Sequence, residues 1–242
     1  MDRALFAAAS GMAAQQRNLD TISDNLANSE VAGFKGSAQT FAALAAPGER
    51  PMGTIALGEH VVFTQGKLER SNGPFDLAID GPGFFVIRDG ARIGYTRDGE
   101  FSRAADGTLR TASGWQLSGI ALPADATSAK VAPDGTLSVT MDNGSTKTLG
   151  RIPVVDFPAP ERLTSVGGTV FAANDRSGRA RPVHLGAQGS AQIQFGMLER
   201  SNVSIVESMM QILAAQRAYE ANAKGVQAAD EMLRIANNLQ RG

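Results

Sequence analysis

The sequence predicts an α+β fold in which N- and C-terminal helices form a discontinuous, coiled-coil-like domain that carries an inserted antiparallel β domain. Both ends of the chain repeat apolar residues at helical spacing, whereas the middle alternates short β-prone runs with turn dipeptides. Apolar residues that recur every seven positions indicate helices packed through a narrow stripe. Closely spaced turn signals indicate antiparallel hairpins.

The N-terminal segment, residues 1–35, is expected to hold a helix from about Asp2 to Asn28. One heptad position of this helix carries Leu5, Met12, Leu19 and Leu26, and Ile22 falls on the other. Gly11 costs the helix about 1 kcal/mol relative to alanine, and Gly33 can terminate the segment.

The C-terminal segment, residues 204–242, is expected to pair with the N-terminal one through a helix from about Ser204 to Leu239. Its seven-residue repeat consists of Ile205, Ile212, Tyr219, Val226 and Leu233. Ser204 and Glu207 have the spacing of a capping box. At ~1.5 Å per residue the helix would be about 50 Å long, which suits a coiled coil. Because a narrow stripe stabilises a helix only when it is packed, the two helices should pair with each other or with neighbouring subunits.

The antiparallel β domain is expected over residues 75–160, between two extended linkers with some strands, 36–74 and 161–203. Asn-Gly and Asp-Gly pairs supply the positive φ that tight hairpins need. These pairs are Asn72-Gly73, Asp80-Gly81, Asp89-Gly90, Asp98-Gly99, Asp106-Gly107, Asp134-Gly135 and Asn143-Gly144.

A short sequence occurs twice, as GKLERSN at 66–72 and as GMLERSN at 196–202. The first copy leads into the β domain and the second leads into the C-terminal helix. We interpret the copies as the two boundaries of the inserted domain, passing side by side at its neck. Chance identity and a domain duplication are the alternatives.

Composition excludes several classes of function. The chain has 242 residues, is 43% hydrophobic and has a formal net charge of −1, which argues against a protein that binds nucleic acid through a broad positive field. It has no Cys, so disulfides and thiolate chemistry are ruled out. No segment approaches the ~18 apolar residues of a membrane span, and the N-terminus is a poor signal peptide. Export would need another route.

No catalytic constellation, cofactor motif or metal site is evident, so we expect a protein that is not an enzyme and has no cofactor. The two histidines, His60 and His184, lack a neighbouring nucleophile or ligand spacing. The carboxylate pairs, Asp98 with Glu100 and Asp76 with Asp80, are more typical of turns. The Gly-rich stretch at 81–83 lacks the spacing of a dinucleotide-binding loop.

Several ordered motifs resemble the signatures of flagellar axial proteins, the family of rod, hook and hook-associated subunits. They are NLANSEVAGFK at 25–35, DLAIDGPGFF at 76–85, TRDGEF at 96–101, LERSNVSIVE at 198–207 and QRAYEANAKGVQAADEML at 216–233. The first motif maps onto Asn25, Leu26, Ala27, Asn28, Gly33, Phe34 and Lys35. Val31 departs from the pattern, because the family usually has Thr there.

The resemblance implies a structural subunit of the flagellar basal-body rod, the drive shaft between motor and hook. It would polymerise helically through its terminal helices in the periplasm, after type III export without a cleaved signal peptide. Its partners would be other rod and hook subunits and the export apparatus, with self-association and without nucleic acid or membrane insertion. The short linker after GFK favours the proximal-rod, FlgF type.

Two alternatives remain: a distal-rod (FlgG-type) or hook-related subunit, and a surface-binding β module with oligomerising helical tails. The second would need an exposed aromatic platform drawn from Phe84, Phe85, Tyr95, Phe101 and Trp115. For the rod hypothesis, we expect the helix residues of the two heptad stripes to form the assembly interface. These are Leu5, Met12, Leu19, Ile22, Leu26, Ile205, Ile212, Tyr219, Val226 and Leu233.

Overall fold

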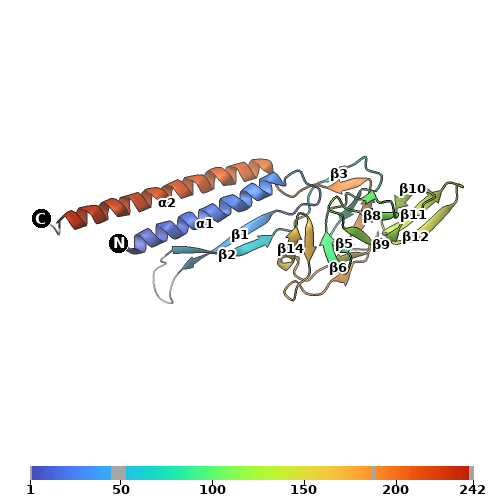
Figure 1. Cartoon of the computed structure of the whole chain (residues 1–242), viewed down its shortest axis with the longest axis horizontal. Helices are drawn as coiled ribbons and strands as arrows, with labels where there is room; N and C mark the ends of the chain where they lie inside the picture. The colour runs from blue at the N-terminus through green and yellow to red at the C-terminus, as the bar shows by residue number, and fades with distance from the viewer. Residues whose placement is uncertain (1, 45–52, 187–188, 240–242) are drawn as a thin grey trace. The chain divides into compact units, whose positions relative to one another are not determined.

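The computed structural model describes residues 2–44, 53–186 and 189–239 (Figure 1). It has a helix at each end and antiparallel sheets between them, which confirms the predicted α+β fold class. Its internal contacts divide the chain into two compact units. Unit 1 comprises residues 1–28, 37–62 and 203–242, and unit 2 comprises residues 29–36 and 63–202. Among the described residues, no helix is long and apolar enough to cross a membrane.

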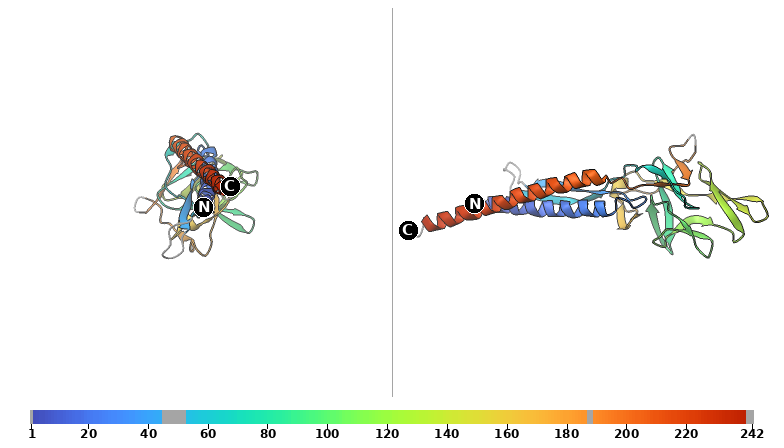
Figure 2. Two further views of the ribbon diagram at one scale, coloured as in Figure 1. Left: turned by 90° about the vertical axis from the view of Figure 1, so that its left-hand side faces the viewer. Right: turned by 90° about the horizontal axis from the view of Figure 1, so that it is seen from above.

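Unit 1 is built from the two terminal helices and one β ribbon. Helix α1 spans Asp2–Ala27 and α2 spans Ile205–Leu239, and they run side by side in opposite directions (Figures 1 and 2). Strands β1 (Ser37–Leu44) and β2 (Gly53–Val61) pair antiparallel and pack against α1. The segment expected as the first linker therefore contributes residues 37–62 to unit 1 and its remainder to unit 2.

The start of α2 is capped as the sequence predicts, although weakly. The Glu207 amide donates to Ser204 Oγ at 3.4 Å. The Glu207 carboxylate accepts a hydrogen bond from Gln211 Nε2 at 3.3 Å, one turn further along the helix. The hydroxyl of Ser204 is thus one of the groups that satisfy the free amides of the first turn.

Unit 2 is an all-β body. Its strands are β3 (Leu68–Arg70), β4 (Leu77–Asp80), β5 (Phe84–Asp89), β6 (Arg92–Thr96), β7 (Ser102–Arg103), β8 (Thr108–Arg110), β9 (Gln116–Ala121), β10 (Ala126–Val131), β11 (Thr136–Met141), β12 (Thr146–Arg151), β13 (Val154–Asp156), β14 (Thr164–Gly167), β15 (Val170–Ala172), β16 (Arg181–Pro182), β17 (Gln192–Phe195) and β18 (Met197–Glu199). A 3₁₀ turn, η1, spans Pro160–Arg162.

The main sheet of unit 2 runs in the order β14-β15-β6-β5-β9-β8-β7, with β13 also paired to β5 and β16 paired to β13. A three-stranded sheet, β10-β11-β12, and the pairs β4–β17 and β3–β18 complete the unit. Its core joins Ile87 and Leu117 of the main sheet to Leu137 of the three-stranded sheet and Ile193 of β17. Because β17 supplies core residues, the segment expected as a return linker is an integral part of unit 2.

A second apolar cluster covers one end of the opposite face of the main sheet. The ring of Phe84 packs edge-on against Phe63 and Phe157, and Phe157 packs against Tyr95. On the other side, Phe85 packs against Phe101. Five aromatic residues were candidates for an exposed binding platform. Four of them, Phe84, Phe85, Tyr95 and Phe101, are buried, and Trp115 is half-buried. The five residues therefore do not form an exposed aromatic platform.

Most of the predicted turn glycines have the required backbone conformation. Gly90, Gly107, Gly135 and Gly144 have φ between 59° and 82°. Gly99 instead serves close approach, because a Cβ there would lie 1.6 Å from the Leu77 carbonyl oxygen. The positive-φ turns predicted at Asn72-Gly73 and Asp98-Gly99 are therefore wrong, because neither Gly73 nor Gly99 has a positive φ.

Candidate functional site

The two copies of the repeated sequence pair with each other. Strands β3 and β18 are antiparallel, with Leu68 opposite Glu199 and Leu198 opposite Glu69. The Arg200 amide donates to the Lys67 carbonyl at 2.9 Å and extends the ladder. The predicted side-by-side arrangement of the two boundaries is confirmed, and it brings residues far apart in sequence into one place.

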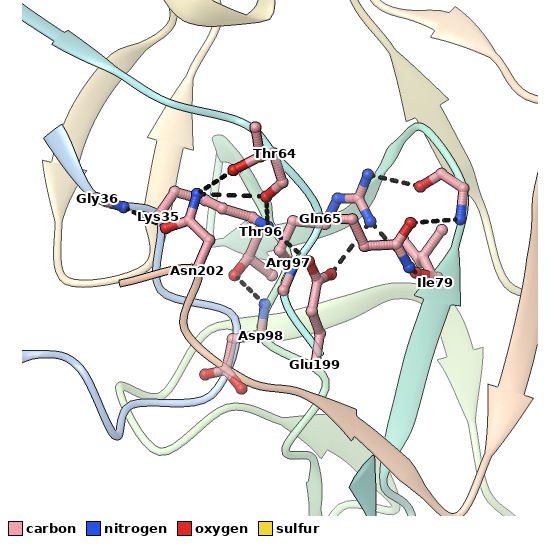
Figure 3. Close-up of polar contacts among 12 residues, drawn as sticks. Lys35, Gly36, Thr64, Gln65, Ile79, Thr96, Arg97, Asp98, Glu199 and Asn202 are labelled. Atoms are coloured by element: carbon pink, nitrogen blue, oxygen red, sulfur yellow. Dashed lines mark hydrogen bonds and ion pairs between the residues drawn. The ribbon is translucent and has the colours of Figure 1, made fainter. Parts of the chain in front are cut away.

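Next to the paired strands β3 and β18 lies a charge cluster, which we define as Lys35, Arg97 and Glu199 (Figure 3). Lys35 Nζ lies 2.5 Å from Glu199 Oε1, and Arg97 Nη1 lies 3.2 Å from Glu199 Oε2. The side chains are 1%, 7% and 0% exposed, respectively. Each residue comes from a different motif: GFK, TRDG and LERSN.

Backbone groups complete the bonding of the charge cluster. Glu199 Oε1 also accepts from the Gly66 amide at 2.8 Å. Lys35 Nζ donates to the Thr64 carbonyl at 2.7 Å, and Arg97 Nη2 donates to the Gly81 carbonyl at 2.7 Å. Among the described residues, no buried side-chain nitrogen or oxygen lacks a partner. Such complete satisfaction is what makes buried ions tolerable.

Asn202, the last residue of the second repeat, ties together chain segments beside the charge cluster (Figure 3). Its Oδ1 accepts from the Gly36 amide at 2.8 Å, and its Nδ2 donates to Thr64 Oγ1 at 3.0 Å. These three residues adjoin the points where the chain passes between unit 2 and unit 1. The Asn202 side chain therefore links three of the segments through which the chain leaves unit 2, and its role is structural.

The first repeat carries an exposed counterpart of the same arrangement. Glu69 is held by Lys67 at 3.0 Å and by Arg200 at 2.9 Å. Each repeat thus presents one carboxylate to one lysine and one arginine, but the Glu69 side chain is 38% exposed and Glu199 is fully buried. Burial is the difference that gives Glu199 its larger energetic weight.

The environment of the charge cluster is reflected in the pKa values of its cations. Burial lowers the pKa of Lys35, and the neighbouring Glu199 carboxylate partly restores it. Burial likewise lowers the pKa of Arg97, against the same carboxylate. Glu199 contacts both cations, and its charge raises the pKa of each against the larger effect of burial.

Gly33 of the NLAN…GFK motif lies against the TRDG turn. Its amide donates to the Glu199 carbonyl at 2.7 Å, and its φ is +67°. A Cβ on Gly33 would lie 2.2 Å from the Asp98 amide nitrogen. Glycine is thus required twice at this position, by backbone conformation and by space.

Gly33→Ala is expected to lower the free energy of unfolding of unit 2 by about 2–4 kcal/mol, because strain and a backbone clash add. Gly90→Ala is the matched control, since Gly90 has φ +59° with nothing within 4 Å of its Cβ position. It should lose only about 1–2 kcal/mol. Urea unfolding followed by the fluorescence of Trp115, the one tryptophan in the sequence, measures both. Equal losses would show that the close approach to Asp98 has no energetic weight.

Asp98 makes unit 2 sensitive to pH. Burial raises the pKa of its carboxyl from 3.8 to about 6, aided by the charges of Glu100 and Asp76 and opposed by the Glu100 amide, which donates at 3.0 Å. Because the folded-state pKa is the higher one, the protonated form favours folding. The contribution is fully present below pH 3.8 and is lost as the pH rises through 6.

Unit 2 should therefore gain stability, by on the order of 1 kcal/mol from Asp98, as the pH falls from about 7 to about 4.5. Asp98→Asn, which keeps Oδ1 for the Glu100 amide, should remove this part of the pH dependence and stabilise unit 2 at neutral pH. Unfolding curves of both proteins across this range give the difference. A parallel pH dependence in the two proteins would contradict the assignment.

The predicted interface residues of α1 lie on the side of the helix that is partly covered within unit 1. Ile22 is 5% exposed and buried, whereas the other four are half-buried. Asn25 of the family motif bonds both backbone groups of Ser37, at 2.7 and 2.8 Å, and so fixes the start of β1. Asn28 Nδ2 donates to the Asp24 carbonyl at 2.8 Å and closes the last turn of α1.

The buried side of α2 consists mainly of small residues. Ser208, Ala215 and Ala229 are at most 5% exposed. Of the predicted set, Ile212 and Val226 are half-buried, but Ile205 and Tyr219 are 42% and 39% exposed. The side chain of Leu233 lies outside the described part of the structure. Small side chains let the helices approach closely, as where Gly11 leaves room for Asn222.

The opposite side of α2 presents an apolar surface to solvent. We define the α2 patch as Val206, Met209, Met210 and Leu213, which are 53–68% exposed. Their spacing of three and four residues places them on one face of the helix. Periodicity alone did not single them out, although four large apolar residues outside the predicted stripe were a signal. Large exposed apolar patches are typical of surfaces that contact other proteins or membranes.

Among the described residues, no group of three or more His, Asp and Glu side chains is placed to hold a metal ion. His60 Nδ1 lies 3.2 Å from Thr40 Oγ1 in the β1–β2 ribbon, a local contact between paired strands. Two features of the chain stand out: the buried charge cluster where the chain passes between the units, and the apolar α2 patch.

Comparison with known proteins matches three family models along the chain. They are "Flagella basal body rod protein" at residues 5–35, "Flagellar hook protein FlgE/F/G D1 domain" at 78–139 and "Flagellar basal body rod FlgEFG protein C-terminal" at 194–239. The first and third of these matches contain Lys35 and Glu199, respectively, and the second contains Arg97.

The chain is also similar over its full length to curated relatives. It is 38% identical to the flagellar basal-body rod protein FlgG of Borreliella burgdorferi and 32% identical to that of Bacillus subtilis, with all of both chains covered in each case. It is 31% identical to the flagellar basal-body rod protein FlgF of Caulobacter vibrioides, covering 98% of this chain and 97% of the relative. The chain belongs to the flagellar basal-body rod protein family, whose members are structural subunits.

Proposed function

We propose that this protein is a subunit of the distal part of the flagellar rod, the FlgG type. The observation that carries the proposal is the full-length similarity to relatives named FlgG, at 38% identity, against 31% for a relative named FlgF. The short linker, which favoured the FlgF type, does not decide the question. The alignment with the Borreliella FlgG spans 265 positions for the 242 residues of this chain, so 23 positions of that alignment have no residue in this chain.

In this function the terminal helices carry the assembly contacts. A rod is a helical polymer, so each subunit needs two different, complementary surfaces rather than one self-complementary surface. The α2 patch supplies one apolar surface of unit 1. Two members of the predicted stripe, Ile205 and Tyr219, are also exposed and belong to the same proposed interface. Partners would be other rod and hook subunits and further copies of this chain.

We further infer that the protein reaches the periplasm through the flagellar type III export apparatus. The support is its membership of the flagellar rod protein family. The test compares where the protein is found in cells with a working export apparatus and in cells without one. Accumulation outside the cytoplasm in both would contradict the inference.

The proposed function is tested by electron microscopy of basal bodies from cells in which this gene is deleted. We expect rods that stop short of the hook, with the inner part of the rod present, and repair by the intact gene. Rods whose inner part is itself incomplete would instead favour the FlgF type. Complete rods with hooks would contradict a rod function altogether.

A further inference from the structure

The main sheet of unit 2 has one face in the core and one face that is only half covered. Ile87 and Leu117 point into the core, so the alternation of side chains places Val86, Arg88 and Ser118 on the other face. The aromatic cluster around Phe84 covers one end of that face. The other end is left open and forms a cleft.

This cleft, which we call the arginine cleft, has a volume of about 550 Å³. Its lining consists of Val86 and Arg88 from β5, Ser118 and Gly119 from β9, and Arg151 and Pro153 at the end of β12. No lining residue is acidic. Val86 and Pro153 are half-buried, so the cleft combines an apolar floor with two guanidinium groups.

Arg88 is oriented but not neutralised. Its Nε donates to Ser118 Oγ at 3.1 Å, and Ser118 is itself only 8% exposed. In the described parts of the chain, no carboxylate lies within ion-pair distance of Arg88, which leaves its two terminal nitrogens available. Arg151 has one partner, Asp134, at 3.1 Å, and the Arg151 side chain is 72% exposed. A guanidinium fork held at its Nε is suited to a carboxylate that accepts two parallel bonds.

Two aspartates lie at the far end of the three-stranded sheet, where the Arg103 guanidinium also donates to the Pro123 and Ala126 carbonyls. Asp125 and Asp142 are both exposed, and the Asp142 amide donates to the Asp125 carbonyl at 3.0 Å, so the two residues are adjacent. Arg151 pairs with Thr136 at the first residue of β11, whereas Asp142 follows its last residue. At ~3.3 Å per residue the ends of this six-residue strand are roughly 20 Å apart, too far for contact within one chain.

We propose that the arginine cleft of one copy binds the Asp125–Asp142 end of a second copy, which gives unit 2 a head-to-tail contact in the polymer. The inference rests on the proposed rod function, because a helical assembly of identical chains needs two different surfaces that fit each other. The cleft and the acidic end are such a pair, opposite in charge and separated along one sheet. Arg88 and Asp142 are the central residues of the contact.

Charge reversal tests the contact in cells that carry the full-length protein. Arg88→Asp and Asp142→Arg should each reduce the amount of the protein in purified basal bodies at least several-fold. The chain with both changes should recover most of the loss, because each contact again joins opposite charges. Lys130→Asp, a reversal on β10 outside both surfaces, is the control. If each single variant is depleted from basal bodies and the double variant is depleted as strongly, the proposal is overturned.

Disulfide trapping identifies the partner independently, since the natural chain has no Cys. Ile93→Cys, beside Arg88 on the neighbouring strand, and Asn143→Cys, beside Asp142, leave both charged residues in place. A chain carrying both cysteines should form a ladder of multimers of itself on oxidation, and neither single variant should go beyond a dimer. Absence of the ladder from basal bodies that contain the protein would contradict the contact alone. Absence of the protein from basal bodies would contradict the rod function itself.

Discussion

Replacing Glu199 with Gln is expected to lower the free energy of unfolding of unit 2 by about 3–5 kcal/mol, the cost of leaving a buried ion pair without one partner. The substitution keeps the size of the side chain but leaves Lys35 and Arg97 buried without a counter-charge. It also replaces one of the oxygens that accept from Lys35, Arg97 and the Gly66 amide by a donor group. Urea unfolding followed by Trp115 fluorescence measures the loss.

Glu69→Gln is the matched control, because it changes the same residue of the other repeat. Glu69 also faces one lysine and one arginine, but at an exposed position where solvent screens the charges. Its substitution should change the stability of unit 2 far less. Comparable losses from the two substitutions would show that burial of the charge cluster is not what gives it weight.

Removing all three charges separates stability from specificity. The variant Lys35→Met, Arg97→Met, Glu199→Met has no buried ion left, and buried ion groups replaced by apolar residues often cost little. We expect its unit 2 to be more stable than that of Glu199→Gln. A triple variant that is less stable than the single one would mean that the hydrogen bonds to Thr64, Gly66 and Gly81, rather than the charges, hold the segments together.

Met210→Asp is expected to abolish incorporation of the protein into rods while leaving the isolated protein folded. Met210 is 59% exposed in the centre of the α2 patch, so its substitution removes no packing within the chain. In an assembled rod it would place a charge in an apolar contact without a partner, which is strongly unfavourable. The amount of protein in purified basal bodies measures the effect, and circular dichroism of the purified chain checks the fold.

The control for the α2 patch is Gln227→Asp, which adds the same charge to an exposed polar position further along the same helix. This variant should enter rods at close to the natural level. If Met210→Asp also enters rods normally, the α2 patch is not an assembly surface. If both variants are excluded, the charge of the helix as a whole, rather than the patch, controls assembly.

The helices and the order of the domains could be predicted because their signals are local. The repeat of apolar residues, the Ser204 cap and the turn glycines each depend on neighbours within a few positions. The observed helices begin and end within one residue of the expected limits. The pairing of the two repeats could also be predicted, because the LERSN sequence occurs at both boundaries of the inserted domain, which suggested that the two copies lie close together.

The charge cluster could not be predicted, because its contacts join residues 102 and 164 positions apart. LERSN occurs twice, and nothing in the sequence distinguishes the buried Glu199 from the exposed Glu69. The helix seam was predicted only in part for a different reason. The seven-residue repeat consists of large apolar side chains, whereas the buried side of α2 consists mainly of small ones such as Ala215 and Ala229. The large residues of the α2 patch lie outside that repeat.

The most direct test of the account is a cryo-EM map of purified basal bodies that resolves the side chains of the rod. The account predicts that this chain occupies the distal rod and that Val206, Met209, Met210 and Leu213 are covered by a neighbouring subunit. A rod in which this chain is present but these four side chains face solvent would contradict the assembly surface. A rod built without this chain would contradict the proposed function.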